Sequence, residues 1–141
     1  MSGAGPHLLP VRVYYEDTDF SGVVYHASYL RFLERGRTEL LRALGVAQRE
    51  LHEGDVQLAF AVRRMSLEFV KPAVMDDLLT IETTPVLARG ATMELSQRVL
   101  REQTPLVTAL VTVACVGAGR ARRIPEALRR RLGLADAHGP G

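Results

Sequence analysis

The chain has 141 residues, a formal net charge of +2 and one cysteine, Cys115. This length predicts one domain with a core of its own, and a single cysteine excludes an internal disulfide, so we expect a reducing, cytoplasmic compartment. The N-terminus shows no signal-peptide pattern, and the longest apolar stretch, Leu106–Val116, is too short to cross a bilayer. The C-terminal cluster GRARRIPEALRRRLG is basic but comes with no nucleic-acid-binding motif, which favours a solvated helix face over a nucleic-acid site.

The first residues predict a tail, a strand and a turn. Residues 1–7 are mostly small and glycine-rich, and we expect them to form a disordered tail. Leu8–Tyr15 contains alternating β-formers and predicts a strand. Glu16–Gly22 consists largely of residues that favour local side-chain hydrogen bonds or a positive φ, which is typical of a turn.

A long helix is predicted from about His26. Leucines recur there at steps of three and four residues, beginning at Leu30 and continuing to Leu44, and Gly45 is a natural end. Gly36 in the middle of this helix costs about 1 kcal/mol relative to alanine. One compensation is that another backbone approaches closely at this position.

The rest of the chain predicts a sheet. Ala47–Gly54 is polar and indicates a loop or a short helical turn. Four strand-like runs follow, separated at KPA, at Arg89-Gly90 and at Thr104-Pro105: Leu58–Val70, Leu78–Leu87, Thr92–Leu100 and Leu106–Val116. Ile124–Leu134 indicates a short basic helix, and 135–141 a flexible tail.

One long helix followed by consecutive hairpins predicts an α+β fold, a single domain over 8–134 in which a five- to six-stranded antiparallel sheet wraps the helix. The strand Leu106–Val116 is apolar on both faces, which is typical of a central, covered strand. Because one helix covers only one face, we expect a second subunit to cover Leu110, Ala114 and Val116.

The turn and the start of the helix resemble a known family. Residues 12–44, RVYYEDTDFSGVVYHASYLRFLERGRTELLRAL, and the later stretch RRMSLEFVKPAVMDDLLTIETT resemble the hotdog-fold thioesterases of the YbgC/4-hydroxybenzoyl-CoA thioesterase family. The motif is D-x-D-x-x-G-x-V-Y-H-x-x-Y, and His26, where the hydroxybenzoyl branch has tyrosine, places the chain nearer the YbgC branch. The resemblance implies a hotdog fold, cofactor-independent hydrolysis of acyl-CoA, a homotetramer built from dimers with active sites at the dimer interface, and an association with the Tol-Pal system.

The resemblance also implies roles for four residues, Tyr15, Asp19, His26 and Arg89. Asp19 occupies the position of the catalytic carboxylate, and Tyr15 and His26 match active-site positions. The backbone N–H of His26 is expected to point at the thioester carbonyl. Arg89 falls near the turn that contacts the CoA phosphates, and Lys71 is a second candidate for that contact. No metal site is expected, since the histidines show no ligand spacing.

The chemistry is consistent with these roles. A helix N-terminus offers N–H donors to a developing oxyanion, and a thiolate leaves without a strong general acid. A single carboxylate then suffices as nucleophile or as general base, and both routes remain open. Each residue also has a structural interpretation: Asp19 as a turn or cap residue, His26 at the surface and Tyr15 in a core or interface, while Glu16 and Asp17 are interpreted as solvated turn carboxylates.

Two alternative functions remain at this stage. A thioesterase that releases acyl chains from acyl carrier protein also fits, because the basic C-terminal surface suits that acidic partner. A non-catalytic scaffold is disfavoured by the presence of Asp19. Three residues depart from the family pattern: Phe20 and Ser21 within the turn, and Gly36, where alanine is common in the family. The first two leave the acyl preference open.

Overall fold

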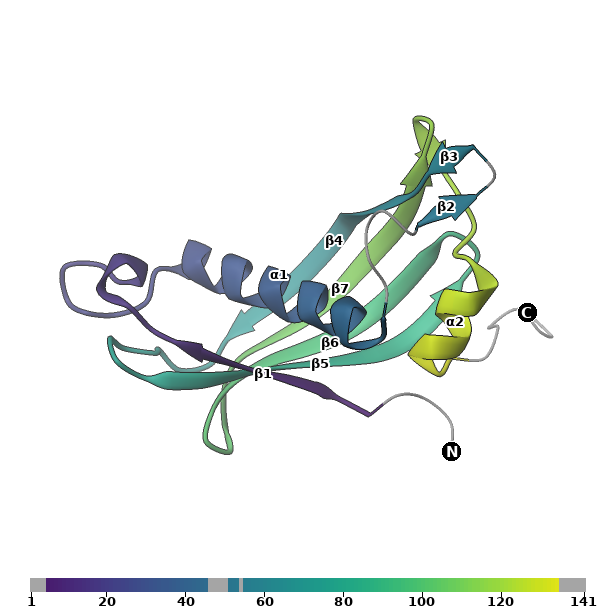
Figure 1. The fold of residues 1–141 in the computed structure, drawn as a ribbon. Coiled ribbons are helices and arrows are strands. Elements are labelled where there is room, and N and C mark those ends of the chain that lie inside the picture. The colour runs from purple at the N-terminus through teal and green to yellow at the C-terminus, as the bar shows by residue number, and fades with distance from the viewer. Residues whose placement is uncertain (1–4, 46–50, 54, 135–141) are drawn as a thin grey trace.

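The structure is a computed structural model that describes residues 5–45, 51–53 and 55–134 (Figure 1). In these residues, antiparallel strands form a six-stranded sheet in the order β1-β5-β6-β7-β4, with β8 pairing to β7, and β2 pairs with β3 in a separate ribbon. The strands are β1 (His7–Arg12), β2 (His52–Glu53), β3 (Val56–Gln57), β4 (Ala59–Phe69), β5 (Leu78–Arg89), β6 (Thr92–Arg101), β7 (Thr104–Gly117) and β8 (Arg120–Ala121). The helices are α1 (His26–Ala43), α2 (Glu126–Leu132) and the 3-10 turn Tyr15–Asp17. The predicted α+β class is confirmed, and no helix in the described ranges is long and apolar enough to cross a membrane.

The helix α1 lies against one face of the sheet (Figure 1). Its buried residues recur at helical spacing and face the strands: Ser28, Tyr29, Phe32, Leu33, Gly36 and Leu40. Gly45 follows the C-cap with φ 81°, so the predicted helix and its end are confirmed. Leu30 was assigned to the inward face by its spacing, but it is exposed, because the aromatic residues Tyr29 and Phe32 define that face.

Gly36 allows α1 to approach the sheet closely. A Cβ atom at this position would lie 2.7 Å from Cγ2 of Ile81, 2.9 Å from Oγ1 of Thr83 and 3.1 Å from Nε2 of Gln97. The expectation that another backbone approaches here is therefore wrong in detail, because side chains of β5 and β6 make the close contacts. The absence of a side chain at Gly36 leaves room for the side chains of Thr83 and Gln97 between the helix and the sheet.

Gln97 connects β6 to the middle of α1. The residue is fully buried, and its Nε2 donates to the Leu33 carbonyl and to Oγ1 of Thr83, both at 2.9 Å. Its Oε1 accepts a hydrogen bond of 3.1 Å from Nη1 of Arg37. Because a buried amide without partners costs about 1–3 kcal/mol, this network ties the helix to one position on the sheet.

Several predicted boundaries differ from the structure. His7 was placed in the disordered tail, but it is the first residue of β1; residues 1–4 and 135–141 of the predicted tails lie outside the described residues. The strand ends at Arg12, so Tyr15 lies in the 3-10 turn instead. Within the predicted loop Ala47–Gly54, His52–Glu53 forms strand β2, while residues 46–50 and 54 lie outside the described residues.

The predicted turn at Thr104-Pro105 is also wrong. Both residues belong to β7, and the chain reverses just before them, where Glu102 has φ 57°. Pro105 pairs with Leu100 beside a register shift in β6, where a ladder hydrogen bond is already disrupted, so the sheet tolerates a proline there.

The two faces of β7 are covered unequally. The face toward α1 is buried: Val107, Ala109, Val111, Val113 and Cys115. On the other face Leu110 is 44% exposed, but Ala114 is only 4% exposed, and the direct neighbours of Leu110 are Ser66 and Ser96. The expectation of a continuous exposed apolar face is therefore only partly correct, because the adjoining strands contribute polar residues.

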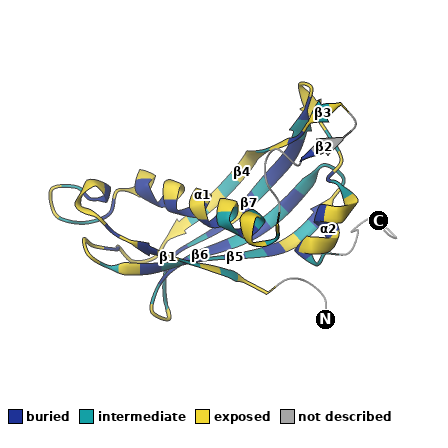
Figure 2. Ribbon diagram, in the orientation of Figure 1, coloured by how far each residue is buried: buried dark blue, intermediate teal, exposed yellow. Residues whose placement is uncertain are grey.

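The edge strand β4 exposes more apolar surface than β7 does. Every inward-facing side chain of this strand remains at least partly exposed, because α1 packs mainly on β5 and β1 and contacts β4 through Phe69 at the end of the strand (Figure 2). These side chains form what we call the β4 row: Phe60, Val62, Met65, Leu67 and Phe69.

Candidate active site

Asp19 lies in a tight reversal that precedes α1. Its backbone N–H donates to the Val23 carbonyl at 2.9 Å, and its carbonyl accepts from Gly22 at 3.0 Å. The carboxylate Oδ1 accepts three hydrogen bonds: from the Ser21 N–H at 2.8 Å, from Ser21 Oγ at 2.7 Å and from the Val23 N–H at 3.2 Å. Since these described contacts all reach Oδ1, they orient the carboxylate and leave Oδ2 for another partner.

The same contacts alter the acidity of Asp19. The hydrogen bonds from the Ser21 side chain and backbone lower the pKa of this carboxyl, and the small burial of the group opposes them. The pKa of Asp19 is lower in the folded state than in the unfolded state. Ionised Asp19 therefore stabilises the fold at pH values above its unfolded-state pKa. That contribution is lost as the pH falls through the folded pKa. Asp19 is therefore an anion throughout the neutral range.

Asp19 and the start of α1 line the same open cleft, which has a volume of about 740 Å³. Its walls come from the turn and from the first turns of the helix: Glu16, Asp19, Val23, Val24, Tyr25, His26, Ala27, Ser28 and Arg31. The N-cap residue Tyr25 makes no side-chain capping bond. The first N–H groups of a helix have no carbonyl partner within it, so those at His26 and Ala27 are suited to polarise a bound carbonyl.

The His26 ring stacks on Phe69 of the β4 row, with ring centroids 4.0 Å apart and planes 13° from parallel. Both residues line a second, smaller pocket of about 160 Å³, together with Tyr29 and Lys71. The Tyr29 hydroxyl in turn accepts a hydrogen bond of 3.0 Å from the Ala73 N–H. The structure therefore brings Asp19, His26 and Lys71 to one end of the molecule.

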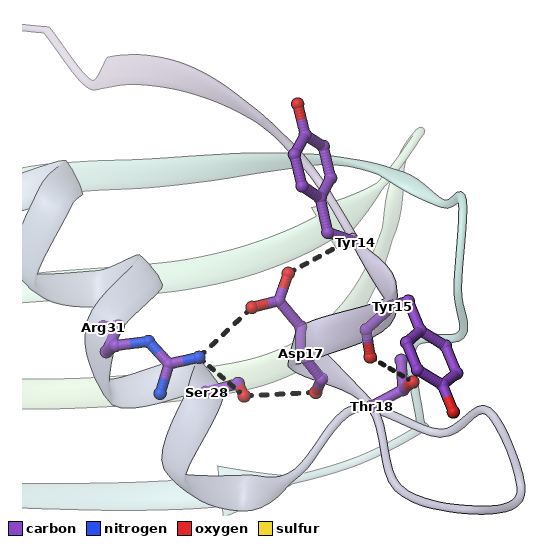
Figure 3. A network of polar contacts seen from close by, with 6 residues as sticks. All are labelled: Tyr14, Tyr15, Asp17, Thr18, Ser28 and Arg31. Carbon is purple, nitrogen blue, oxygen red and sulfur yellow. Dashed lines mark hydrogen bonds and ion pairs between the residues drawn. The ribbon is translucent and has the colours of Figure 1, made fainter.

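Arg89 and Tyr15 are not brought to the cleft in the same way. Arg89 is the last residue of β5, which has 12 residues and begins at Leu78. The beginning of β5 is the end near the turn, because the Val13 N–H donates to the carbonyl of Asp77, the residue before Leu78. At about 3.3 Å per residue, Arg89 lies roughly 36 Å along the strand from that end. Tyr15 is 74% exposed, and its ring points away from Arg31 and Asp17 (Figure 3). Neither residue lines the two pockets that contain His26.

The interpretation of Asp17 as a solvated turn carboxylate is wrong. The residue is 6% exposed, and its Oδ2 accepts a hydrogen bond of 2.9 Å from the Tyr14 N–H. Its Oδ1 forms an ion pair of 3.1 Å with Nη2 of Arg31, on the second turn of α1 (Figure 3). Sequence reasoning missed this contact. The available signal was that Ser28 and Arg31 are three residues apart, so they share one side of the helix.

No group of three or more His, Cys, Asp or Glu side chains that could hold a metal ion occurs in the part of the chain that the structure describes.

The fold and the cleft together define a class of protein: a hotdog-fold hydrolase, with one long helix on an antiparallel sheet and a carboxylate turn at the helix start. Comparison with known proteins agrees. The model of the thioesterase superfamily matches residues 21–108. The chain therefore belongs to the thioesterase superfamily, and its relatives place it in the YbgC-like branch.

Two relatives illustrate how far the likeness extends. The acyl-CoA thioesterase YbgC of Haemophilus influenzae is 49% identical over 129 residues, which cover 92% of this chain and 93% of that protein. The crystal structure of a probable thioesterase from Bartonella henselae superposes with a TM-score of 0.80 at 45% identity, over 86% of this chain and 100% of that one. The predicted hotdog fold is thereby confirmed.

Proposed function

We propose that the protein hydrolyses acyl-CoA thioesters to a free acid and CoA. The observation that carries this proposal is the shared cleft, in which the ionised Asp19 faces the same space as the start of α1. The names of the YbgC relatives support acyl-CoA as the substrate. In this proposal the thioester carbonyl oxygen lies at the helix start, where the N–H groups stabilise the developing oxyanion.

Asp19 can act by either of two balanced routes. In the first, its oxygen attacks the carbonyl carbon, the C–S bond breaks, CoA leaves as the thiolate, and water hydrolyses the resulting anhydride. In the second, the carboxylate accepts a proton from a water molecule whose oxygen attacks the same carbon, the C–S bond breaks, and CoA leaves as the thiolate. The lowered pKa of Asp19 keeps the carboxylate in the reactive ionised form for both routes.

A hydrolysis screen tests the function directly. Acyl-CoAs of different chain length and ring content are compared with the same acyl groups on acyl carrier protein, and thiol release is measured. We expect turnover of at least one acyl-CoA. Turnover of carrier-protein substrates alone would favour the alternative function, and turnover of neither would leave only the non-catalytic scaffold.

His26→Ala is expected to lower kcat less than a change at Asp19. Alanine keeps the backbone N–H at the helix start, and only the imidazole and its stacking on Phe69 are lost. Steady-state kinetics on the best acyl-CoA measures this. A loss as large as that of Asp19→Asn would assign a direct chemical role to the imidazole.

We propose that Lys71 and, from a second subunit, Arg89 contact the phosphates of CoA, since β5 holds each chain's own Arg89 roughly 36 Å along the strand from the end near its cleft. Arg89→Ala is then expected to raise KM about two- to fivefold with little change in kcat, since an exposed charge contact contributes up to about 1 kcal/mol of uniform binding. The effect shrinks at high salt because the charges are screened. Lys71→Ala, at the pocket beside His26, serves as the comparison. An unchanged KM for Arg89→Ala at low salt would remove Arg89 from the site.

We propose that the protein is a tetramer, a dimer of dimers in which two chains share each active site. The β4 row supports this, because it is an apolar strip on an edge strand whose last residue, Phe69, stacks on His26 and lines the smaller pocket beside the cleft. A partner there would place a second chain beside His26 and the smaller pocket. Light scattering across a dilution series is expected to give a tetramer, and a fully active monomer of 15.5 kDa would contradict it.

The cellular setting is also a proposal. A single cysteine, buried in β7, supports a reducing cytoplasmic location. The resemblance to the YbgC branch supports Tol-Pal components and acyl carrier protein as candidate partners.

A further inference from the structure

Asp17 is connected to the start of α1 by its carboxylate and by its backbone. Its carbonyl accepts hydrogen bonds from the Tyr25 N–H at 3.0 Å and from Ser28 Oγ at 3.1 Å. Its carboxylate pairs with Arg31, whose Nη2 also donates to Ser28 Oγ at 3.1 Å (Figure 3). Residue 17 is therefore held to the N-cap, the first turn and the second turn of the helix.

We infer that Asp17 and Arg31 form a positioning pair, which sets the distance between the Asp19 carboxylate and the N–H groups at the start of α1. Only one residue separates Asp17 from Asp19, and the segment from Asp17 to Tyr25 is closed by the hydrogen bond between those two residues. Any shift of Asp17 along the helix therefore moves Asp19 relative to His26. This inference rests on the proposed function, because the positioning of Asp19 matters for the rate only if Asp19 and the helix start act on the same substrate.

The burial of the pair favours a positioning role over a surface contact. The Asp17 side chain is 9% exposed, whereas the Arg31 side chain is 50% exposed at the wall of the cleft. Removing Arg31 leaves a buried carboxylate without its cation, and such a group is strongly driven toward water. The Tyr14 N–H still donates to Oδ2 of Asp17, but Oδ1 is left without its partner, and an outward movement of the turn that exposes Oδ1 to water takes Asp19 with it. A displacement of about 1 Å at a reacting group costs up to about 100-fold in rate.

The opposite face of the sheet provides a matched control. Arg98 pairs with Glu82 at 2.6 Å, and the two side chains are 42% and 18% exposed, close to the values for Arg31 and Asp17. Arg98 and Glu82 are cross-strand neighbours on β6 and β5, on the face away from α1. Arg98→Gln thus removes a similar ion pair that does not involve the turn or α1.

The experiment measures kcat, KM and the melting temperature of Arg31→Gln, Arg31→Lys, Asp17→Asn, the Asp17→Asn/Arg31→Gln double variant and Arg98→Gln on an acyl-CoA that the wild type hydrolyses. We expect Arg31→Gln to lower kcat about 10- to 100-fold with KM within about threefold. Arg31→Lys, which keeps the charge, should recover part of the loss. The double variant should be no slower than the slower single variant, since both changes break one contact. Arg98→Gln should keep the wild-type kcat.

Three outcomes would overturn the inference: a kcat for Arg31→Gln within twofold of wild type, a loss confined to KM, or an equal loss in Arg98→Gln. If Asp17→Asn does not fold, the half-exposed Arg31 still decides the question. Asp19→Asn is measured alongside. Full activity in Asp19→Asn would count against the proposed site itself, whereas an inactive Asp19→Asn with an unaffected Arg31→Gln would count against the positioning pair alone.

Discussion

Asp19→Asn is expected to lower kcat for acyl-CoA hydrolysis by about 10²–10⁴-fold, the usual size of a general-base contribution. Asparagine has nearly the same shape and can still accept hydrogen bonds from Ser21 and Val23 through its Oδ1. It has no negative charge, however, so it can neither attack the thioester carbon nor accept a proton from water. The fold should survive, because Asp19 lies in a partly exposed turn outside the core.

A neighbouring carboxylate provides the control for this prediction. Asp76 is exposed and has φ 73°, a conformation that asparagine also tolerates, and its described hydrogen bonds come from its backbone. Asp76→Asn makes the same chemical change close to the site and should leave kcat unchanged. Turnover of Asp19→Asn within a few-fold of wild type would remove this residue from the mechanism.

Gly36→Ala is expected to destabilise the fold by about 2–4 kcal/mol, although alanine is the better helix former by about 1 kcal/mol. The added Cβ would lie 2.7 Å from Cγ2 of Ile81 and 3.1 Å from Nε2 of Gln97, well inside contact distance. Overpacking of this kind costs about 1–3 kcal/mol, and displacing Gln97 adds about 1–3 kcal/mol for its buried amide.

Thermal unfolding measures the effect, with an expected drop in Tm of about 5–15 °C for a chain of this size. Thr38→Ala on the exposed side of α1 is the control: it also introduces alanine, and it should be neutral or slightly stabilising. A Gly36→Ala variant as stable as wild type would mean that α1 can move away from β5 without cost.

Features that depend on neighbouring residues were predictable from the sequence. The helix from His26 to its end before Gly45, the strands β5, β6 and β7, the reversal between β5 and β6 and the turn that contains Asp19 all follow from local periodicity and turn chemistry. The turn motif also indicated, through its resemblance to the thioesterase family, which carboxylate faces the helix start. Local hydrogen bonding and side-chain spacing act over a few residues, so these features can be predicted from a single sequence.

Only the tertiary structure decided which groups meet across the chain. Asp17 looks like any turn carboxylate until α1 folds back and Arg31 covers it, 14 residues later. Gly36 looks like a helix defect until Gln97, 61 residues away, occupies the space above the sheet. Arg89 and Lys71 look equivalent as phosphate contacts until the length of β5 separates Arg89 from the cleft of its own chain. These contacts depend on the order of the strands in the sheet and on where the helix lies on it. Composition and local residue spacing describe one segment at a time, so they do not predict which distant segments meet.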